Sequence, residues 1–156
     1  MSEILIRRAG ADEIEPLTRW RVEVLREVFS IPQDQPVEGL EAENRRYYQR
    51  ALASGEHIAC FACLDGGIVG CGGVCLYGEM PSPDVPSGRC AYLMNIYVRP
   101  EIRGQGVGEA IIKWLVERAR ETGAEKIYLE TSDAGRALYT KLGFVPMPDM
   151  MKLPGR

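Results

Sequence analysis

The segment from residue 98 to residue 108 reads Val98-Arg99-Pro100-Glu101-Ile102-Arg103-Gly104-Gln105-Gly106-Val107-Gly108. It joins an almost continuous apolar stretch, typical of a central strand, to an amphipathic helix that begins within the glycines. The glycines allow a tight turn and a close approach of the backbone to a ligand. The first amide groups of the helix lack internal partners, and the helix dipole favours negative charge there. The segment therefore predicts an anion site that fits a pyrophosphate, with Arg103 as a cation at its edge.

Two other phosphate-binding motifs fit this segment less well. A P-loop requires Lys and Ser or Thr after its last glycine, whereas Gly108 is followed by Glu109 and Ala110. A dinucleotide fingerprint requires a third glycine where this chain has Glu109, and the antiparallel hairpin expected before the segment is wrong for that fold. Glu130, at the end of the following strand, could still take the place of the ribose-binding acid, so dinucleotide binding stays open as an alternative.

Outward from this segment, hydrophobic patterns predict the remaining elements. On the N-terminal side we expect strand 4–8, helices 12–29 and 41–53, strands 57–64 and 68–77 joined by a tight Asp-Gly-Gly turn, and strand 89–98. On the C-terminal side we expect helix 106–121, strand 126–131, helix 134–142, a strand that opens at residues 143–145, and a final edge strand at 150–153. The order β-α-α-β-β-β-α-β-α-β predicts an α/β fold (an α+β mixed sheet) with helices on both faces.

The composition indicates one globular domain over residues 1–156. Apolar residues make up 46% of the chain and charged residues 26%, which allows a real core. The net charge of -3 gives no electrostatic case for nucleic acid. No window is apolar enough to span a bilayer, and the N-terminus lacks the pattern of a signal peptide. We therefore expect a cytoplasmic protein with no nucleic-acid or membrane partner.

The five cysteines do not predict a metal centre. Cys60 and Cys63 have C-x-x-C spacing, but they lie in an expected strand, where residues three apart point to opposite faces. An odd number of cysteines and a cytoplasmic setting also argue against a disulfide framework. We interpret them as small apolar residues of the hairpin and expect no metal.

Three parts of the sequence resemble one known family. Arg103-x-x-Gly106-x-Gly108 resembles the pyrophosphate-binding signature of the GNAT superfamily of acyl-CoA N-acyltransferases. Residues 93–100 resemble that family's central fourth strand, and residues 135–144 resemble its closing Leu-Tyr-x-x-x-Gly-Phe segment. The resemblance implies a GNAT-like N-acetyltransferase domain whose fourth and fifth strands splay apart. It also implies acetyl-CoA (coenzyme A) as co-substrate and direct attack of a primary amine on the acetyl group.

The resemblance also implies roles for individual residues. The Ile96 amide would stabilise the charge that develops on the carbonyl oxygen, and Tyr139 would be the general acid for the leaving thiolate. Ser132 would contact the pantetheine arm, or it would cap the following helix. Arg136 and Lys141 could meet phosphates, but a solvated helix charge is the interpretation that we favour for both. The other cofactor-binding positions run along the central strand and through the glycine loop: Ile96, Tyr97, Val98, Arg103, Gly104, Gln105, Gly106, Val107, Gly108 and Glu109.

The general base is not specified by the resemblance. Some members carry a glutamate where this chain has Tyr92, so the task would pass to a water chain or to another acid. Glu79 and Asp84 are candidates in a proline-rich loop. Asn95 could touch the acceptor, and we expect His57 to be a structural or exposed residue.

The acceptor stays open, because its pocket would be built by the parts of the chain that carry no family motif. These are the first two helices and the loop at residues 78–88. A small-molecule or peptide amine fits, and a homodimer through the last strands is a tendency of the family. The alternatives are a different acyl-CoA, an oxygen acceptor, or a non-catalytic module that binds or senses coenzyme A.

Overall fold

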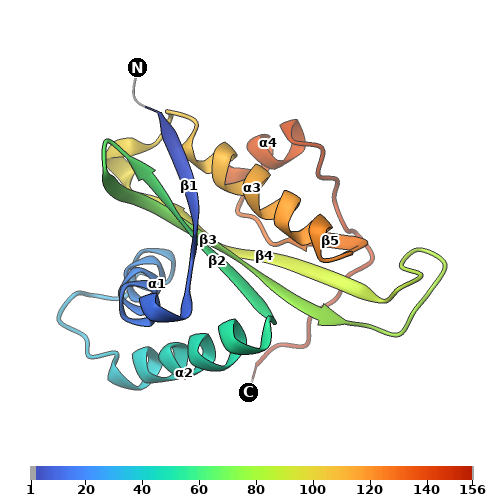
Figure 1. Ribbon diagram of the computed structural model, residues 1–156, viewed down its shortest axis with the longest axis horizontal. Coiled ribbons are helices and arrows are strands. Elements are labelled where there is room, and N and C mark those ends of the chain that lie inside the picture. The colour runs from blue at the N-terminus through green and yellow to red at the C-terminus, as the bar shows by residue number, and fades with distance from the viewer. Residues whose placement is uncertain (1–2, 156) are drawn as a thin grey trace.

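A computed structural model describes residues 3–155, and in this part of the chain five strands form one mixed sheet (Figure 1). The strands lie side by side in chain order: β1 (Ile4–Ala9), β2 (His57–Leu64), β3 (Gly67–Gly78), β4 (Arg89–Val98) and β5 (Lys126–Leu129). Neighbours are antiparallel except β4 and β5, which are parallel because a helix returns the chain across the sheet. The predicted mixed α/β fold is confirmed.

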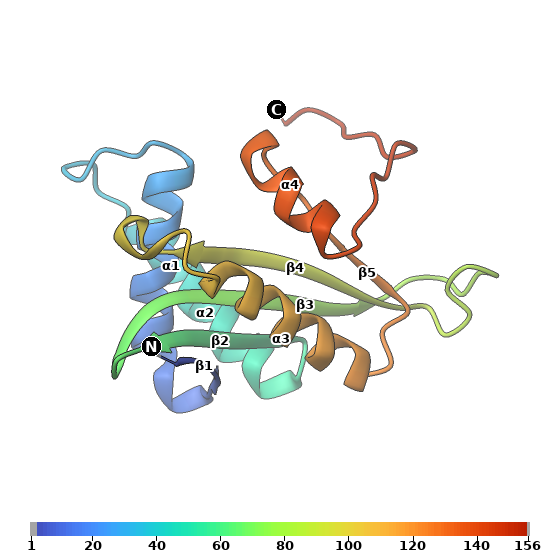
Figure 2. The same ribbon diagram turned by 90° about the horizontal axis from the view of Figure 1, so that it is seen from above.

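Helices cover both faces of the sheet (Figures 1 and 2). One face carries α1 (Ile14–Val28), which follows the short 3-10 turn η1 (Ala11–Glu13), and α2 (Glu38–Ser54). The other face carries α3 (Val107–Glu121) and α4 (Asp133–Lys141), and the turn η2 (Pro100–Ile102) leads from β4 into α3. The sheet therefore separates two layers of helices.

Each face of the sheet has its own hydrophobic core. Between the sheet and α3, the fully buried side chains include Leu93 of β4 and Ile111 and Leu115 of α3. Between the sheet and α1 and α2, Trp20 and Phe61 pack at a ring distance of 6.3 Å. These cores hold β4 between both helical layers, so a residue on β4 can contribute to sites on either side.

Glycines in β3 let α3 lie close to the sheet. A methyl group at Gly72 would lie 2.6 Å from Ile111 and 3.0 Å from Leu115, closer than any real side chain tolerates. The helix therefore packs on the backbone of β3 rather than on side chains. This packing fixes where α3 begins, at the end of the glycine loop.

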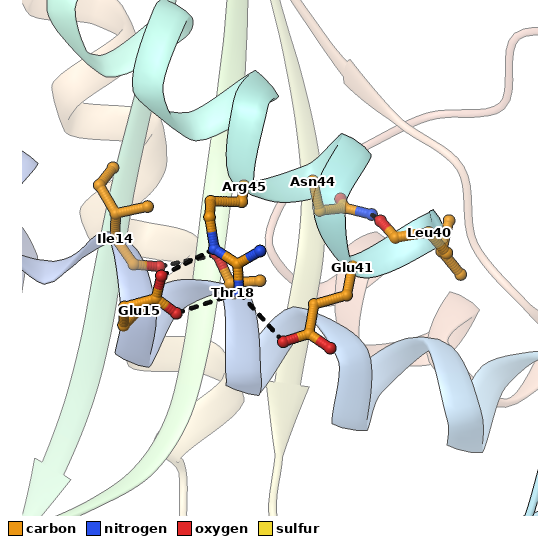
Figure 3. A network of polar contacts seen from close by, with 7 residues as sticks. All are labelled: Ile14, Glu15, Thr18, Leu40, Glu41, Asn44 and Arg45. Atoms are coloured by element: carbon orange, nitrogen blue, oxygen red, sulfur yellow. Dashed lines mark hydrogen bonds and ion pairs between the residues drawn. The ribbon is translucent and has the colours of Figure 1, made fainter. Parts of the chain in front are cut away.

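Polar contacts join α1 to α2 on the opposite face (Figure 3). Arg45 of α2 donates to Glu15 of α1 over 2.7 Å and to Glu41 over 3.1 Å. Within α2, the amide of Asn44 donates to the Leu40 carbonyl over 2.9 Å. Exposed ion pairs contribute little stability, typically under about 1 kcal/mol, but they orient the two helices relative to each other.

The two C-terminal strands expected at residues 143–145 and 150–153 are wrong. Residues 144–155 contain no strand, and Val145 and Met151 are 79% and 99% exposed. Pro146 and Pro148 remove backbone donors that a ladder requires, which gives the physical reason. The homodimer expected through these strands stays a prediction.

Two features are absent from residues 3–155. No helix in this range has the length and apolarity needed to cross a membrane. No group of three His, Cys, Asp or Glu side chains in the same range could hold a metal ion. The cysteines are free thiols, and Cys60, Cys71 and Cys90 are buried.

Candidate active site

β4 and β5 diverge part-way along their length. Their parallel ladder runs from the pair Cys90↔Lys126 to the pair Leu93↔Leu129, where β5 ends. β4 continues to Val98, so in the described part of the chain its later residues have no strand partner on that side. An unpaired strand edge offers amide and carbonyl groups to an extended ligand. This arrangement agrees with the splayed strands expected from the family resemblance.

β4 carries a bulge where the two strands diverge. Between the pairs Gly73↔Met94 and Cys71↔Tyr97, β4 has two residues where β3 has one. Asn95 lies in the bulge with φ 58°, in the left-handed region that asparagine tolerates better than most residues. The extra residue shifts the alternation of side chains, so that Tyr97 packs into the core on the α1 face.

The glycine loop builds a row of amides that donate to no group in residues 3–155. Gly104 and Gly106 have φ of 85° and 88°, which other residues rarely adopt. Gly106 caps α3 without a side-chain hydrogen bond, and the first amide to find a partner is that of Ala110, which donates to the Gly106 carbonyl over 3.1 Å. The amides before it lie at the positive end of the helix dipole, so they suit an anion.

These features open into one groove of about 560 Å³ between β4, the loop, α1 and α4. It collects nine of the predicted cofactor-binding residues: Ile96, Tyr97, Val98, Arg103, Gly104, Gly106, Val107, Gly108 and Glu109. The structure does not bring Gln105 or Ser132 into the lining. Glu27 and Val28 of α1 also line it, and no motif in the sequence points to them.

Arg103 supports the loop with its side chain. Its Nε donates to the Val98 carbonyl over 2.8 Å, and its Nη2 pairs with Glu27 over 2.8 Å. The guanidinium also lies over the Tyr97 ring, 5.4 Å from the ring centroid. The Val98 carbonyl and the guanidinium are therefore bonded to each other, whereas the backbone amides from Gly104 to Glu109 donate to no group in residues 3–155.

Two charged side chains meet at the opposite wall of the groove. Lys141 of α4 pairs with Glu109 of α3 over 3.1 Å, and the lysine lowers the pKa of that carboxyl group. Lys141 lines the groove, although the sequence favours a solvated helix charge over contact with phosphates. Arg136, with the same expectation, lies outside this groove.

Tyr139 lies half-buried beside the groove. Its ring packs edge-on against Phe144, with centroids 5.7 Å apart. A methyl group on Gly135, which lines the groove, would lie 3.3 Å from the Tyr139 ring. Burial raises the pKa of Tyr139, so the phenol keeps its proton at neutral pH and can donate it. Ser132 caps α4, since its Oγ accepts from the Gly135 amide over 3.3 Å.

A second cavity, of about 310 Å³, lies on the other side of β4, beneath α2. Its lining combines residues of α1, α2 and three strands: Arg21, Glu43, Asn44, Tyr47, Tyr48, His57, Cys75, Met94 and Asn95. His57 is 5% exposed and shares a hydrogen bond of 2.8 Å with the Tyr47 hydroxyl. Burial lowers the pKa of His57 to about 4, so it is neutral at pH 7 and a weak base.

Glu79, one of the two candidate bases of the proline-rich loop, is held in other contacts. Glu79 pairs with Lys126 over 3.2 Å and accepts from Tyr77 over 3.1 Å, and the lysine lowers the pKa of its carboxyl group. Tyr92 stacks on Tyr128 with centroids 5.0 Å apart. Burial, together with the charge of Glu130, raises the pKa of Tyr92 to about 12. Tyr92 therefore keeps its proton at neutral pH and does not replace a glutamate as base.

Comparison with known proteins agrees with the fold. Residues 25–144 match the model of the Acetyltransferase (GNAT) family. A predicted acetyltransferase from Clostridium acetobutylicum, whose crystal structure contains acetyl-CoA, superposes with a TM-score of 0.86 at 26% identity. That comparison covers 97% of this chain and 96% of the other.

Curated proteins match a shorter region. The chain is 35% identical over 91 residues to the thialysine N-epsilon-acetyltransferase of Sus scrofa, which covers 44% of this chain and 54% of that protein. It is 36% identical over 58 residues to the probable glucosamine 6-phosphate N-acetyltransferase 2 of Oryza sativa subsp. japonica, covering 37% of this chain and 35% of that protein. The match thus spans about half the length of the first relative and about a third of the second.

Proposed function

The chain belongs to the GNAT family of acetyltransferases, and we propose that it transfers the acetyl group of acetyl-CoA to a primary amine. The observation that carries this proposal is the row of unpaired amides from Gly104 to Glu109, which continues into the unpaired edge of β4. Together they supply donors for a diphosphate and for an amide-bearing arm within one groove of about 560 Å³. The acetyl-CoA in the similar Clostridium acetobutylicum structure supports the same donor here.

Each part of the groove has a task in this proposal. The amides of the glycine loop hold the pyrophosphate. Gly108 has no side chain and therefore leaves room for it at the first turn of α3. The β4 edge at Ile96 and Val98 aligns the pantetheine arm, while the Val98 carbonyl accepts its hydrogen bond from Arg103. Lys141 lies at the wall of the groove, where its pairing with Glu109 offsets the negative charge of that carboxylate toward a phosphate.

The chemical step is direct attack of the neutral amine on the thioester carbonyl. The amine nitrogen forms a bond to the carbonyl carbon, the Ile96 amide donates to the oxygen that becomes negative, and the carbon–sulfur bond breaks. Tyr139 gives its hydroxyl proton to the leaving thiolate, and the amine releases its proton to water. The raised pKa of Tyr139 keeps the acid in its protonated form.

Removal of the Tyr139 hydroxyl tests the proposal. We expect acetyl-CoA to bind in a calorimetric titration, and an amine panel to release free thiol steadily. Tyr139→Phe should lower kcat by about 100-fold or more, because general acid catalysis contributes about 10²–10⁴-fold. Its midpoint of thermal unfolding should change little, because the ring still packs on Phe144.

The control is Tyr77→Phe, an exposed tyrosine outside the groove, which should leave kcat unchanged. Binding of acetyl-CoA without thiol release from any amine would favour the non-catalytic coenzyme A-binding or sensing module. Absence of binding with the fold intact would remove both functions. A thermal shift with NAD and none with coenzyme A would favour the dinucleotide alternative.

A further inference from the structure

The cavity beneath α2 meets the groove at the bulge of β4. Met94 and Asn95 line the cavity, and Ile96, the next residue, lines the groove. The bulge turns Asn95 toward α1 and α2, where its side chain contacts Tyr48 and Arg21. A ligand in the cavity therefore lies next to the groove, beside the backbone amide proposed to hold the carbonyl oxygen.

Arg21 is the charged side chain that α1 contributes to this cavity. Its Nη1 donates to Oδ1 of Asn95 over 3.0 Å, and its Nε donates to Oδ1 of Asn44 over 3.3 Å. Both acceptors are neutral amide oxygens. Within residues 3–155 no carboxylate lies at ion-pair distance from Arg21, so its positive charge has no local counter-charge.

Other arginines that link separate elements are paired differently. Arg45, Arg99 and Arg103 each bridge to a different element through a glutamate, at distances of 2.7, 3.1 and 2.8 Å. A half-buried charge is normally compensated in this way. The amide partners of Arg21 fix the position of the guanidinium but leave its charge available to a ligand.

The two amides are themselves oriented for this task. The Nδ2 of Asn44 donates to the Leu40 carbonyl over 2.9 Å (Figure 3), which turns its oxygen toward Arg21. The Nδ2 of Asn95 donates to the Tyr48 hydroxyl over 3.5 Å, with the same effect on its own oxygen. The guanidinium is therefore held from two sides, and its Nη2 donates to no group in the described residues.

The remaining lining adds no competing charge inside the cavity. Tyr47 and Tyr48 are neutral at pH 7, since burial raises the pKa of both hydroxyls. His57 is neutral for the reason given above. Glu43 lies exposed at the rim, where it pairs with Arg46. Arg21 is therefore the side chain that makes the interior of the cavity positive.

On the basis of the proposed function, we infer that this cavity is the acceptor pocket and that Arg21 binds an anionic group, a carboxylate or a phosphate, carried by the acceptor amine. A guanidinium binds either group through paired charge-assisted hydrogen bonds. The volume of about 310 Å³ lies at the lower end for ligand pockets and suits a small amine such as an amino acid or an amino sugar phosphate.

Matched amines test the inference on the unaltered protein. Thiol release from acetyl-CoA should be measured with free amino acids against their neutral amides, and with glucosamine 6-phosphate against glucosamine. We expect kcat/KM to be at least about 10-fold higher for the anionic member of one of these pairs, since a hydrogen bond to a charged group is worth about that much. The pair that responds distinguishes a carboxylate from a phosphate.

Variants of Arg21 show whether that preference arises in the cavity. Arg21→Met should raise KM for the preferred anionic amine about 10- to 100-fold and remove the preference over its neutral partner. Arg21→Lys, which keeps the charge and loses the planar fork, should have a smaller effect. The dissociation constant of acetyl-CoA should not change. Arg19→Met is the matched control, because Arg19 is exposed on α1 and lies outside the cavity. Its KM and its preference between the amines should equal those of the unaltered protein.

Two results would overturn the inference and leave the proposed function standing. One is equal turnover of anionic and neutral amines by the unaltered protein. The other is an equal loss with both classes in Arg21→Met, which would indicate a structural role for Arg21. If no amine in the panel releases thiol, the proposed function fails and the inference falls with it.

Discussion

His57, the single histidine of the chain, lines the cavity beneath α2. A methyl group on Gly73 would lie 2.6 Å from its Nε2, so the ring packs directly on the β3 backbone. The Tyr47 hydroxyl lies 2.8 Å from its Nδ1. Burial lowers the pKa of His57 to about 4, with a smaller contribution from the charge of Arg21, because a buried imidazolium has lost its hydration.

This burial predicts a loss of stability in mild acid. Above pH 6.5 the imidazole is neutral in both the folded and the unfolded chain. Between pH 6.5 and 4 the unfolded chain binds a proton that the folded chain excludes, so the free energy of unfolding falls as the pH falls. From pH 7 to pH 4.5 the His57 contribution should amount to about 2–3 kcal/mol, measured by urea unfolding.

The comparison variant is His57→Gln, which removes the titrating group and leaves every carboxylate in place. Its unfolding free energy should fall less between pH 7 and pH 4.5 than that of the unaltered protein. An identical fall in both proteins would show that His57 does not carry the effect.

Single residues differ in how far the sequence reveals them. The glycines of the loop stand in a motif whose chemistry is local, so Gly104 and Gly106 could be assigned from spacing alone. Asn95 could not be assigned in this way, because its left-handed conformation arises from the bulge that shifts the register between β4 and β3. Arg21 could not either, because its partners come from α2 and β4, 23 and 74 residues away in the chain.

At the scale of the element, Gly108 in the first turn of α3 influences two properties: the stability of the helix and the space left for the proposed pyrophosphate. Gly108 is the second residue of the helix, and an added methyl group would meet Leu138 and Val98 at 3.9 Å, an ordinary contact. The fold therefore tolerates a side chain at this position. Both neighbours line the groove, so the methyl group would lie where the pyrophosphate is proposed to bind.

We therefore expect Gly108→Ala to stabilise the protein and to weaken acetyl-CoA binding. The free energy of unfolding should rise by up to about 1 kcal/mol, because alanine loses less backbone entropy in a helix. The dissociation constant of acetyl-CoA should rise about 10-fold, an energy of about 1.4 kcal/mol, measured by calorimetry.

Gly39→Ala provides the matched control, since Gly39 is the second residue of α2 and a methyl group there meets nothing within 4 Å. It should show the gain in stability without the loss of affinity. Equal affinity in Gly108→Ala and the unaltered protein would mean that the pyrophosphate does not approach this turn.

Elements with a buried, regular pattern could be predicted, and those without one could not. The apolar run of β4 predicted its bounds, Arg89 to Val98, as the structure has them. The same reasoning failed after α4, where Val145, Met150 and Leu153 suggested strands but are exposed. Apolar residues predict burial only where a partner surface exists, and no strand of the described residues extends the sheet beyond β5.

At the scale of the whole molecule, the groove and the cavity are both lined by β4 and α1, and they meet at the adjacent residues Asn95 and Ile96. With both proposed substrates bound, the amine would approach the thioester at this junction, without an enzyme-bound acetyl group. Cys75, the thiol in the cavity lining, has its pKa raised by burial and is therefore a poor nucleophile.

This arrangement predicts a sequential kinetic mechanism. Initial rates measured against acetyl-CoA at several amine concentrations should give intersecting double-reciprocal lines. Acetyl-CoA alone should leave no acetylated protein in a mass spectrum. Parallel lines together with an acetylated cysteine would instead indicate transfer through the enzyme.

The sheet also has a consequence for how the molecule is made, since its strands lie in the order in which they are synthesised. Each strand can pair with its predecessor as the chain emerges, and domains form from the N-terminal side first during translation. The cavity beneath α2 is complete at residue 95, whereas the groove requires side chains up to residue 141. A ribosome-bound chain would thus complete the proposed amine pocket before the proposed acyl-donor groove.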